Sequence, residues 1–205
     1  ITHVPEDASF ATDVAQDEDL PGAVARLGAV PRVAYACPSE KPDRWAGASA
    51  ASIERIHREG GFAATYVKAD GARMRWVKAP ADEEPALPAC CTTVLPVVAA
   101  RCIGEPLDER VAHRLERVAR VTGLREGEII SAAHLGRLLA SPLGMMKLTE
   151  SRRVVPVINM VDDARREASA REAAEVALAA NARIDRVVLT CLARREAPVV
   201  AVVRR

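Results

Sequence analysis

Two short polar stretches follow apolar runs in this sequence, and their residue types are those that bind ligands. In VVPVINMVDD, residues 154–163, a run rich in Val and Ile leads into Asn159 and then Asp162. In FAATYVKADG, residues 62–71, a second run leads into Asp70. Each run predicts a buried strand, and ligands of parallel sheets bind beyond the carboxyl ends of the strands. If the two strands are parallel, both acids are expected along the same edge of the sheet.

Asp162 has the chemistry to recognise a purine base. Its carboxylate can accept hydrogen bonds from two adjacent donors, which the N1 and exocyclic N2 groups of guanine offer, while Asn159 can hold the loop or contact the ring. The pattern N-M-V-D resembles the N-K-x-D element of GTP-binding proteins, with Met160 in the lysine position. The alternative is structural, because Asp162 or Asp163 can cap the helix that follows. The two acids are adjacent, so both roles are compatible.

Asp70 and Gly71 suit a metal site at the end of a strand. An acid before a glycine, which lets the backbone turn sharply, resembles the residue that positions Mg²⁺ in phosphate-cleaving folds. The same dipeptide is common in simple turns, so a turn is the alternative. Lys78, in the stretch WVKAP, can pair with a phosphate or can be a solvated loop lysine.

Apolar spacing along the chain predicts strands that alternate with helices. The predicted helices lie at 19–28, 49–61, 107–123, 131–139 and 163–180. The predicted strands lie at 32–37, 62–69, 93–100, 154–159, 185–192 and 198–203. Prolines and acids predict a loop over 72–88.

This alternation favours an α/β fold, with a mostly parallel sheet and flanking helices. The last two strands are separated only by 193–197, which is too short for a crossover helix, so they are expected to form an antiparallel hairpin. Pro96 and Pro156 lie inside two of the apolar runs and leave the boundaries of those strands open. A chain of 205 residues is expected to form a single α/β domain over 1–205, with a mainly helical segment at about 102–150.

Composition argues against several classes of protein. Lys and Arg number 29 against 28 for Asp and Glu, and aromatic residues make up 3%, so neither a basic field nor a stacking surface for nucleic acid is expected. No apolar run approaches the roughly 20 residues of a membrane span. The five cysteines include no C-x-x-C pair, so neither a zinc site nor a disulfide framework is expected. Scattered, unpaired cysteines favour a cytoplasmic protein. The adjacent Cys90 and Cys91 are expected to be buried, the alternative being a site that carries selenium or sulfur.

Four stretches of the sequence occur in an order and spacing that indicate a family. They are VKADGARMRWVKAPADEEPALP, GEPLDERVAHRLERVARVTGL, SPLGMMKL and RVVPVINMVDD. From about Gly61 to the C-terminus, the sequence resembles the YqeC-type family of selenium-dependent molybdenum hydroxylase accessory proteins. The resemblance implies a P-loop NTPase-like fold. It also implies a nucleotide-binding role in maturing the selenium-containing cofactor of molybdenum hydroxylases.

The resemblance assigns roles to individual positions. The positions that match its motifs are Asp70, Gly71, Arg73, Lys78, Pro80, His113, Lys147, Asn159 and Asp162. The implied catalytic residues are Asp70 and Lys78, with Mg²⁺ held at Asp70. The implied contacts to bound GTP or ATP are Gly71, Arg73, Lys147, Asn159 and Asp162. The implied partners are a nucleotide and a selenium-dependent molybdenum hydroxylase or selenium carrier protein.

The sequence departs from the family pattern at two of these motifs. Lys68 stands where the pattern has Glu, and Met160 stands where it has Lys. Both changes favour an alternative function, a non-catalytic adapter that docks a molybdenum hydroxylase or selenium carrier through segment 102–150.

The phosphate-binding element of the family is also not found. Family members begin with a strand, a glycine-rich G-x-G-G-K-T-like loop and a helix, whose backbone N–H groups and lysine hold phosphates. The glycines of this sequence do not fit that pattern. We therefore expect that the chain begins roughly 40 residues late relative to the family, either because an upstream part is missing or because the phosphate site is lost.

Overall fold

The computed structural model describes residues 4–5, 14–15, 34–37, 39–40, 44–60 and 62–205. Residue contacts divide the chain into two compact units. Unit 1 comprises Ile1–Gly71 and Ala86–Cys90, and unit 2 comprises Ala72–Pro85 and Cys91–Arg205. The single domain over 1–205 stays a prediction. The predicted helix at 19–28 lies outside the described residues.

One helix and four two-residue strands are described in unit 1. The strands are β1 (Val4–Pro5), β2 (Val14–Ala15), β3 (Ala34–Tyr35) and β4 (Arg44–Trp45), with β1 antiparallel to β4 and β2 parallel to β3. β3 lies within the strand predicted at 32–37. Helix α2 (Ala50–Glu59) confirms the helix predicted at 49–61, and its first turn is capped by Ser49, whose Oγ accepts a hydrogen bond from the Ser52 N–H at 3.0 Å.

The strand predicted at 62–69 is wrong. Residues 63–70 belong to no strand, and the side chain of Tyr66 is 87% exposed. Residues with high β-propensity form a strand only where a neighbouring strand hydrogen-bonds their backbone, and no strand that the structure describes pairs with residues 63–70. His57 of α2 hydrogen-bonds the Thr65 hydroxyl at 3.1 Å. Asp70 and Gly71 therefore do not follow a strand.

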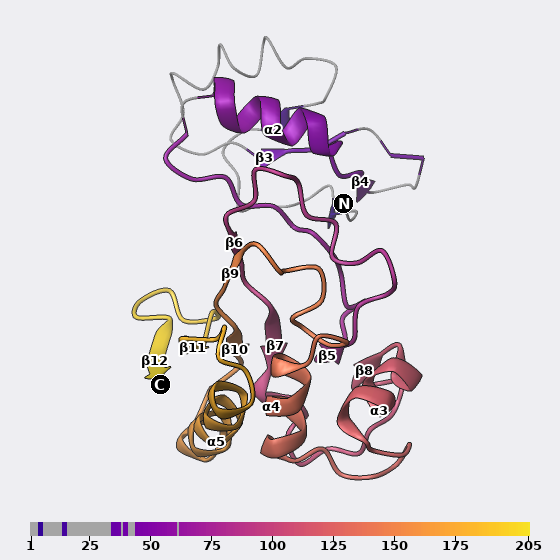
Figure 1. The fold of residues 1–205 in the computed structure, drawn as a ribbon, viewed down its shortest axis with the longest axis vertical. Coiled ribbons are helices and arrows are strands. Elements are labelled where there is room, and N and C mark those ends of the chain that lie inside the picture. Colours follow the sequence, from indigo (N-terminus) through magenta and orange to yellow (C-terminus); the bar gives the residue numbers. More distant parts are fainter. Residues whose placement is uncertain (1–3, 6–13, 16–33, 38, 41–43, 61) are drawn as a thin grey trace. The chain divides into compact units, whose positions relative to one another are not determined.

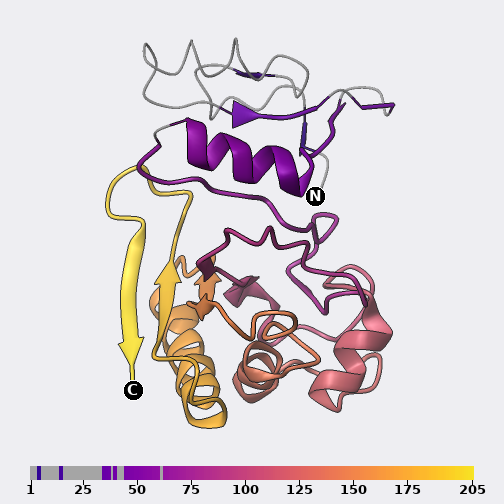
Figure 2. The same ribbon diagram turned by 45° about the horizontal axis from the view of Figure 1, so that its top comes forward.

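A four-stranded sheet organises unit 2 (Figures 1 and 2). Its strands, in spatial order, are β12 (Val199–Arg204), β11 (Arg186–Thr190), β10 (Val157–Asn159) and β7 (Val97–Ala99). β7, β10 and β11 are parallel, and β12 runs antiparallel to β11. The mixed α/β class and the C-terminal antiparallel hairpin are confirmed.

Prolines split two of the predicted strands. The run at 93–100 contains β6 (Thr93–Val94) and β7 in place of one strand, and the run at 154–159 is divided between the end of β9 (Arg153–Val154) and β10. β6 pairs with β9, and β7 pairs with β10. At the break, the proline carbonyls act as acceptors: the Val157 N–H donates to Pro96 O at 2.8 Å, and the Val188 N–H donates to Pro156 O at 2.9 Å. Proline has no N–H to donate, so it interrupts the hydrogen-bond ladder of a sheet, while its carbonyl can still accept a hydrogen bond.

A further parallel pair lies next to β7. It consists of β5 (Val77–Lys78) and β8 (Ala112–His113). The Ala99 N–H at the end of β7 donates to Trp76 O at 3.0 Å, which joins this pair to the sheet. β5 interrupts the loop predicted over 72–88, and the 3₁₀ helix η2 (Ala100–Cys102) follows β7.

Three α-helices complete unit 2, and two of them lie within one residue of the predicted boundaries. They are α3 (Leu115–Thr122), α4 (Ala132–Ala140) and α5 (Ala164–Ala180). Ser131 caps α4 and Asp163 caps α5, so both predicted helices are confirmed. None of the described helices has the length and apolar character that crossing a membrane requires.

The helix predicted at 107–123 begins late. It starts at Leu115, because Arg114 has a left-handed backbone with φ of 60°. Ahead of it, the Asp108 carboxylate accepts hydrogen bonds from the N–H groups of Arg110 at 2.9 Å and Val111 at 3.0 Å, which stabilises a turn instead of a helix. The predicted end is correct, since Gly123 terminates α3 with φ of 80°.

The core of unit 2 lies between the helices and the sheet. Ile158 of β10 and Leu189 of β11 are fully buried, and so is the alanine stripe of α5 at positions 170, 173, 174 and 177. Small side chains let α4 approach α5 closely: a Cβ added to Gly136 would lie 2.6 Å from both the backbone oxygen of Ala173 and the Cβ of Val176. This packing fixes the start of α5 relative to the strand ends.

Candidate functional site

The first group of polar residues lies at the carboxyl ends of β10 and β11, and we call it the strand-end cluster. It consists of Asn159, Asp162, Arg166, Thr190 and Cys191. The Asn159 Oδ1 accepts hydrogen bonds from the Thr190 hydroxyl at 3.1 Å and from the Leu192 N–H at 3.0 Å. Of the two roles that the sequence left open for Asn159, the structure therefore shows it holding a loop, the one that follows β11.

Asp163, and not Asp162, caps α5. The Asp163 Oδ1 accepts from the Arg166 N–H at 2.8 Å. The side chain of Asp162 is 45% exposed, it pairs with Arg166 Nη1 at 3.2 Å, and its Oδ1 accepts from the Cys191 thiol at 3.2 Å. Its carboxylate is thus fixed in orientation and still open to solvent, which is what recognition of a ligand with two donors requires.

A depression with a volume of about 200 Å³ lies where β7 and β10 end. Its lining includes Arg101 and Glu105 after β7, and Asp163, Arg165 and Arg166 at the start of α5. Ligands of open parallel sheets bind at this edge.

The second group surrounds residues 79–84, and we call it the loop cluster. It consists of Lys78, Asp82, Glu84, Arg114, Arg117 and Lys147. The Glu84 carboxylate accepts from Lys78 Nζ at 2.6 Å and from both terminal nitrogens of Arg114, at 2.6 and 2.8 Å. Lys78 is only 4% exposed, so the alternative of a solvated loop lysine is wrong.

The rest of the loop cluster holds the backbone and the second acid of the same loop. Arg117 binds the two oxygens of Asp82 at 2.8 and 2.9 Å. Lys147, in the turn that follows α4, donates to Ala81 O at 2.6 Å and lies 3.6 Å from Asp82. The structure therefore brings together Lys78 and Lys147, two residues that the sequence marked separately.

These contacts shift the titration of both loop acids and of a neighbouring histidine. Hydrogen bonds from Arg114 above all, and from Lys78, lower the pKa of Glu84 to about 2. Arg117 in the same way lowers the pKa of Asp82 to about 2. Burial lowers the pKa of His113, and the charges of Arg114, Arg73 and Lys78 lower it further. The charge of Glu84 acts on His113 in the opposite direction and raises its pKa.

The remaining predicted residues belong to neither of these two groups. Asp70 and Gly71 belong to unit 1, where the Asp70 carbonyl accepts from Lys68 Nζ at 3.1 Å. Arg73 and Met74 both have positive φ, in a turn closed by the Arg75 N–H and Ala72 O at 2.9 Å. Across the described ranges, no group of three or more His, Cys, Asp or Glu side chains could hold a metal ion.

Several residues of the two clusters were not predicted. They are Asp82, Glu84, Arg114, Arg117, Arg166, Thr190 and Cys191. A usable signal was the pair of alternate acids in a proline-bounded loop, together with Arg114 and Arg117 three residues apart in AHRLER. Nothing local marks Thr190 and Cys191, whose role depends on the pairing of β11 with β10.

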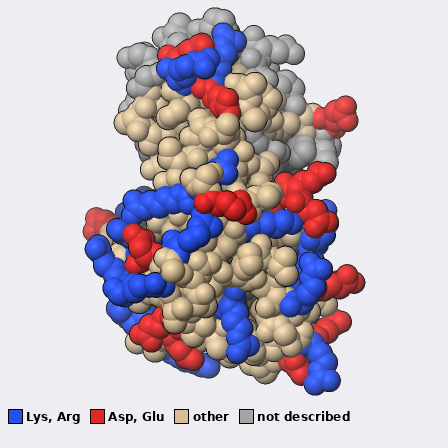
Figure 3. Space-filling model, viewed as in Figure 1, with Lys and Arg blue, Asp and Glu red and all other residues tan. Residues whose placement is uncertain are grey.

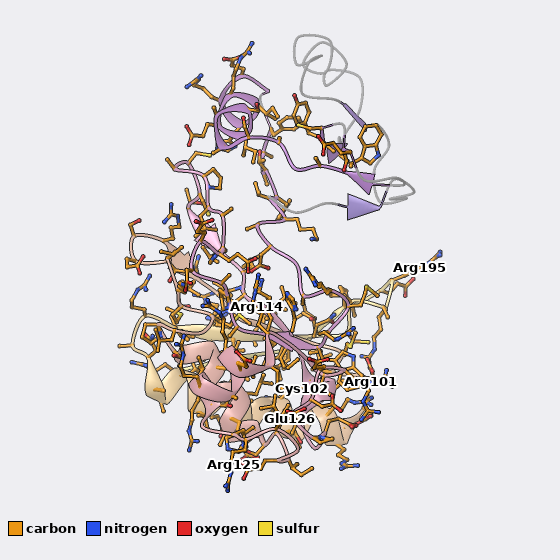
Figure 4. The ribbon with its side chains drawn as sticks, turned by 90° about the vertical axis from the view of Figure 1, so that its right-hand side faces the viewer. Arg101, Cys102, Arg114, Arg125, Glu126 and Arg195 are labelled. Atoms are coloured by element: carbon orange, nitrogen blue, oxygen red, sulfur yellow. The ribbon has the colours of Figure 1, made fainter. Side chains whose placement is uncertain are left out.

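The cations of unit 2 differ in how far they are enclosed. Figure 4 shows Arg114 among other side chains near α3, whereas Arg125 and Arg195 project outward. The side chain of Arg114 is 27% exposed, against 89% for Arg125. On the face drawn in Figure 3, Lys and Arg side chains are interspersed with Asp and Glu, in agreement with the net charge of +1.

Comparison with known proteins adds three findings. The family model described as "YqeC protein" matches residues 2–116, more than half of the chain. The "Uncharacterized protein YqeC" of Escherichia coli (strain K12) is 30% identical over 81 residues, which cover 40% of this chain and 32% of that protein. The match therefore spans about a third of the length of this relative. No solved structure matches the chain.

Proposed function

The chain belongs to the YqeC family, and on that basis we propose that it is a nucleotide-binding accessory protein. It acts in maturation of the selenium-containing cofactor of molybdenum hydroxylases, in the cytoplasm, with a selenium-dependent molybdenum hydroxylase or a selenium carrier as its protein partner. The proposal includes a P-loop NTPase-like architecture, which is supported by the parallel strands β7, β10 and β11 and by the crossover helix α5 between the last two.

The observation that carries the nucleotide proposal is the state of Asp162. Asp163 takes the capping role, so the Asp162 carboxylate, although it contacts Arg166 and the Cys191 thiol, stays accessible to solvent at the edge where ligands of such sheets bind. A carboxylate pairs with the adjacent N1–H and N2–H donors of guanine. Adenine presents an acceptor at N1, so GTP is preferred over ATP.

The metal of the proposed complex is Mg²⁺, with Asp70 as its ligand. Mg²⁺ needs only one or two carboxylates when the phosphates of a nucleotide supply other oxygens, so a single acid is sufficient. When bound, the ion would neutralise phosphate charge. Gly71 and Arg73 are proposed to contact the same phosphates.

The base assignment is tested with Asp162→Asn. An amide replaces one acceptor oxygen by a donor, so GTP binding is expected to weaken by about 10- to 100-fold, the loss of roughly 1.5–3 kcal/mol of hydrogen bonding to a charged group. The variant is expected to bind xanthosine triphosphate, which carries a carbonyl at C2, with a higher affinity relative to GTP than the wild type does. Isothermal titration calorimetry with Mg²⁺ measures both.

The matched control is Asp163→Asn, which makes the same charge change one residue further on and keeps a good capping residue. Its GTP affinity is expected to equal that of the wild type. Equal losses in the two variants, or an unchanged affinity in Asp162→Asn, would contradict the assignment.

The alternative function is a non-catalytic adapter that docks the hydroxylase or carrier. One observation favours it: segment 102–150 exposes the large apolar side chains of Ile129 (56%), Leu143 (56%) and Leu148 (40%). Met160 also leaves the proposed base site without the lysine of the family pattern.

A further inference from the structure

The Glu84 carboxylate is held by a set of donors that also suits phosphate. Arg114 contributes two parallel N–H groups at 2.6 and 2.8 Å, and Lys78 contributes an ammonium at 2.6 Å. The Ala81 N–H lies 3.4 Å from the same carboxylate. An arginine fork with a lysine point charge and a backbone N–H is a common way to bind phosphate oxygens. We call these three donor groups the anion seat.

Two of the three donors of the seat come from elements outside the loop that carries Glu84, and the third, the Ala81 N–H, belongs to that loop. Lys78 ends β5, which pairs with β8, and Arg114 directly precedes α3. Lys78 is 4% exposed, so its position is fixed by packing and its charge needs an anion nearby. Glu84, in contrast, comes from a loop segment without helix or strand.

The seat is also reachable from solvent. The side chains of Glu84 and Arg114 are 26% and 27% exposed, so an incoming anion can approach the guanidinium while Glu84 turns away by rotation of its side chain. An anion with more charge than a carboxylate is attracted more strongly by Lys78 and Arg114 than Glu84 is.

We propose that the anion seat of Lys78, Arg114 and the Ala81 N–H is a phosphate-binding site, and that the Glu84 carboxylate fills it when no ligand is bound. The ligand class is a phosphate ester or polyphosphate. Binding exchanges one anion for another, with no covalent step. This site is separate from the base recognition proposed at Asp162 and does not rest on it.

The experiment uses inorganic pyrophosphate, titrated calorimetrically into the full chain at constant ionic strength. Glu84→Gln removes the internal competitor, and its affinity for pyrophosphate is expected to rise about tenfold or more. Glu83→Gln is the matched control, because it makes the same charge change at the exposed neighbouring residue. Its affinity is expected to stay at the wild-type value.

Two further variants keep the proposal decidable. Arg114→Gln is expected to lose most of the pyrophosphate affinity. Glu84→Asp keeps the charge that Lys78 needs but shortens the side chain, so it is expected to bind pyrophosphate more tightly than the wild type, even if Glu84→Gln does not fold. Circular dichroism checks folding of each variant.

The outcomes separate this inference from the base assignment. Asp162→Asn is expected to leave pyrophosphate binding unchanged, since pyrophosphate has no base. If the folded Glu84 variants bind pyrophosphate no more tightly than Glu83→Gln, the seat is only an internal ion pair and the proposal is overturned. A GTP effect at Asp162 would then still stand.

Discussion

Glu84 shows how one side chain can stabilise a loop that has little regular structure. Charged residues are seldom buried without a partner, and Lys78 would be costly at 4% exposure without the carboxylate 2.6 Å away. Arg114 binds the same carboxylate through both terminal nitrogens, so one acid satisfies two cations from different elements. The state of Glu84 therefore decides how firmly the loop is held.

Glu84 is expected to make the stability of the protein sensitive to acid. Its pKa is about 2 in the folded protein against an ordinary 4.5, so the unfolded chain takes up the proton first as the pH falls. The stabilising contribution is complete above pH 4.5 and is lost as the pH falls toward 2. Glu84→Gln should be less stable than the wild type at pH 6. Its stability should also fall less steeply than that of the wild type between pH 4.5 and about 2.

Urea unfolding at a series of pH values measures this difference. Glu83→Gln is the control and is expected to keep the wild-type pH dependence. A Glu84→Gln variant whose acid sensitivity matches that of the wild type would show that the ion pair does not contribute in this way.

The helix pair α4 and α5 illustrates packing at the scale of elements. Gly136 of α4 lies against the backbone of Ala173 and the side chain of Val176, in a space that admits no Cβ. The four fully buried alanines of α5 serve the same close approach. Because Asp163 opens α5, the position of this helix also sets the position of the strand-end cluster.

Gly136→Ala is expected to destabilise the protein, although alanine favours helix by up to about 1 kcal/mol over glycine. The new methyl group would lie 2.6 Å from a backbone oxygen. This overpacking is expected to cost about 1–3 kcal/mol, from which the gain in helix propensity is subtracted. Ala179→Leu adds more volume at an exposed position of α5 and is expected to change stability by less than about 0.5 kcal/mol. Chemical denaturation compares the two, and a Gly136→Ala variant as stable as the wild type would contradict the close packing.

At the scale of the whole molecule, charge is nearly balanced, so the proposed adapter function would depend on local surface rather than on long-range charge. The net charge of +1 with interspersed signs gives little long-range steering. Segment 102–150 instead offers exposed apolar side chains, of a kind enriched where proteins contact one another.

If the chain acts as the proposed adapter, its docking to a purified selenium-dependent molybdenum hydroxylase is expected to depend on this segment. The double variant Leu143→Ser Leu148→Ser removes two exposed side chains and should weaken binding by about tenfold, as apolar contacts at an interface are lost. Leu192→Ser is the control, since Leu192 is 58% exposed outside the segment. Surface plasmon resonance measures the affinities. Equal binding by all three proteins would exclude docking through Leu143 and Leu148.

Elements with local signals were predictable, and those that need distant partners were not. Ser49, Ser131 and Asp163 mark helix starts by side-chain capping within three residues, so α2, α4 and α5 were found. The run at 62–69 has strand composition but no neighbouring strand, so its prediction failed. In 107–114, the Asp108 side chain and a left-handed Arg114 override the helical spacing.

By itself, the sequence determined the α/β class, the C-terminal hairpin, the family and the polar residues at the end of β10. The class, the hairpin and the polar residues follow from apolar period, capping chemistry and short connections, all of which act over a few residues. The family follows from the resemblance carried by four separate motifs. Only the tertiary structure decided that Asp163 caps α5, and that Asn159 holds the loop after β11. It also decided that Lys78 and Lys147 both hydrogen-bond residues of the loop 79–84. The contacts of Asn159 and Lys147 join residues far apart in the chain, and no local pattern records which side chains packing will bring within hydrogen-bonding distance. The Asp163 cap is local, but with two adjacent acids the sequence left open which one forms it.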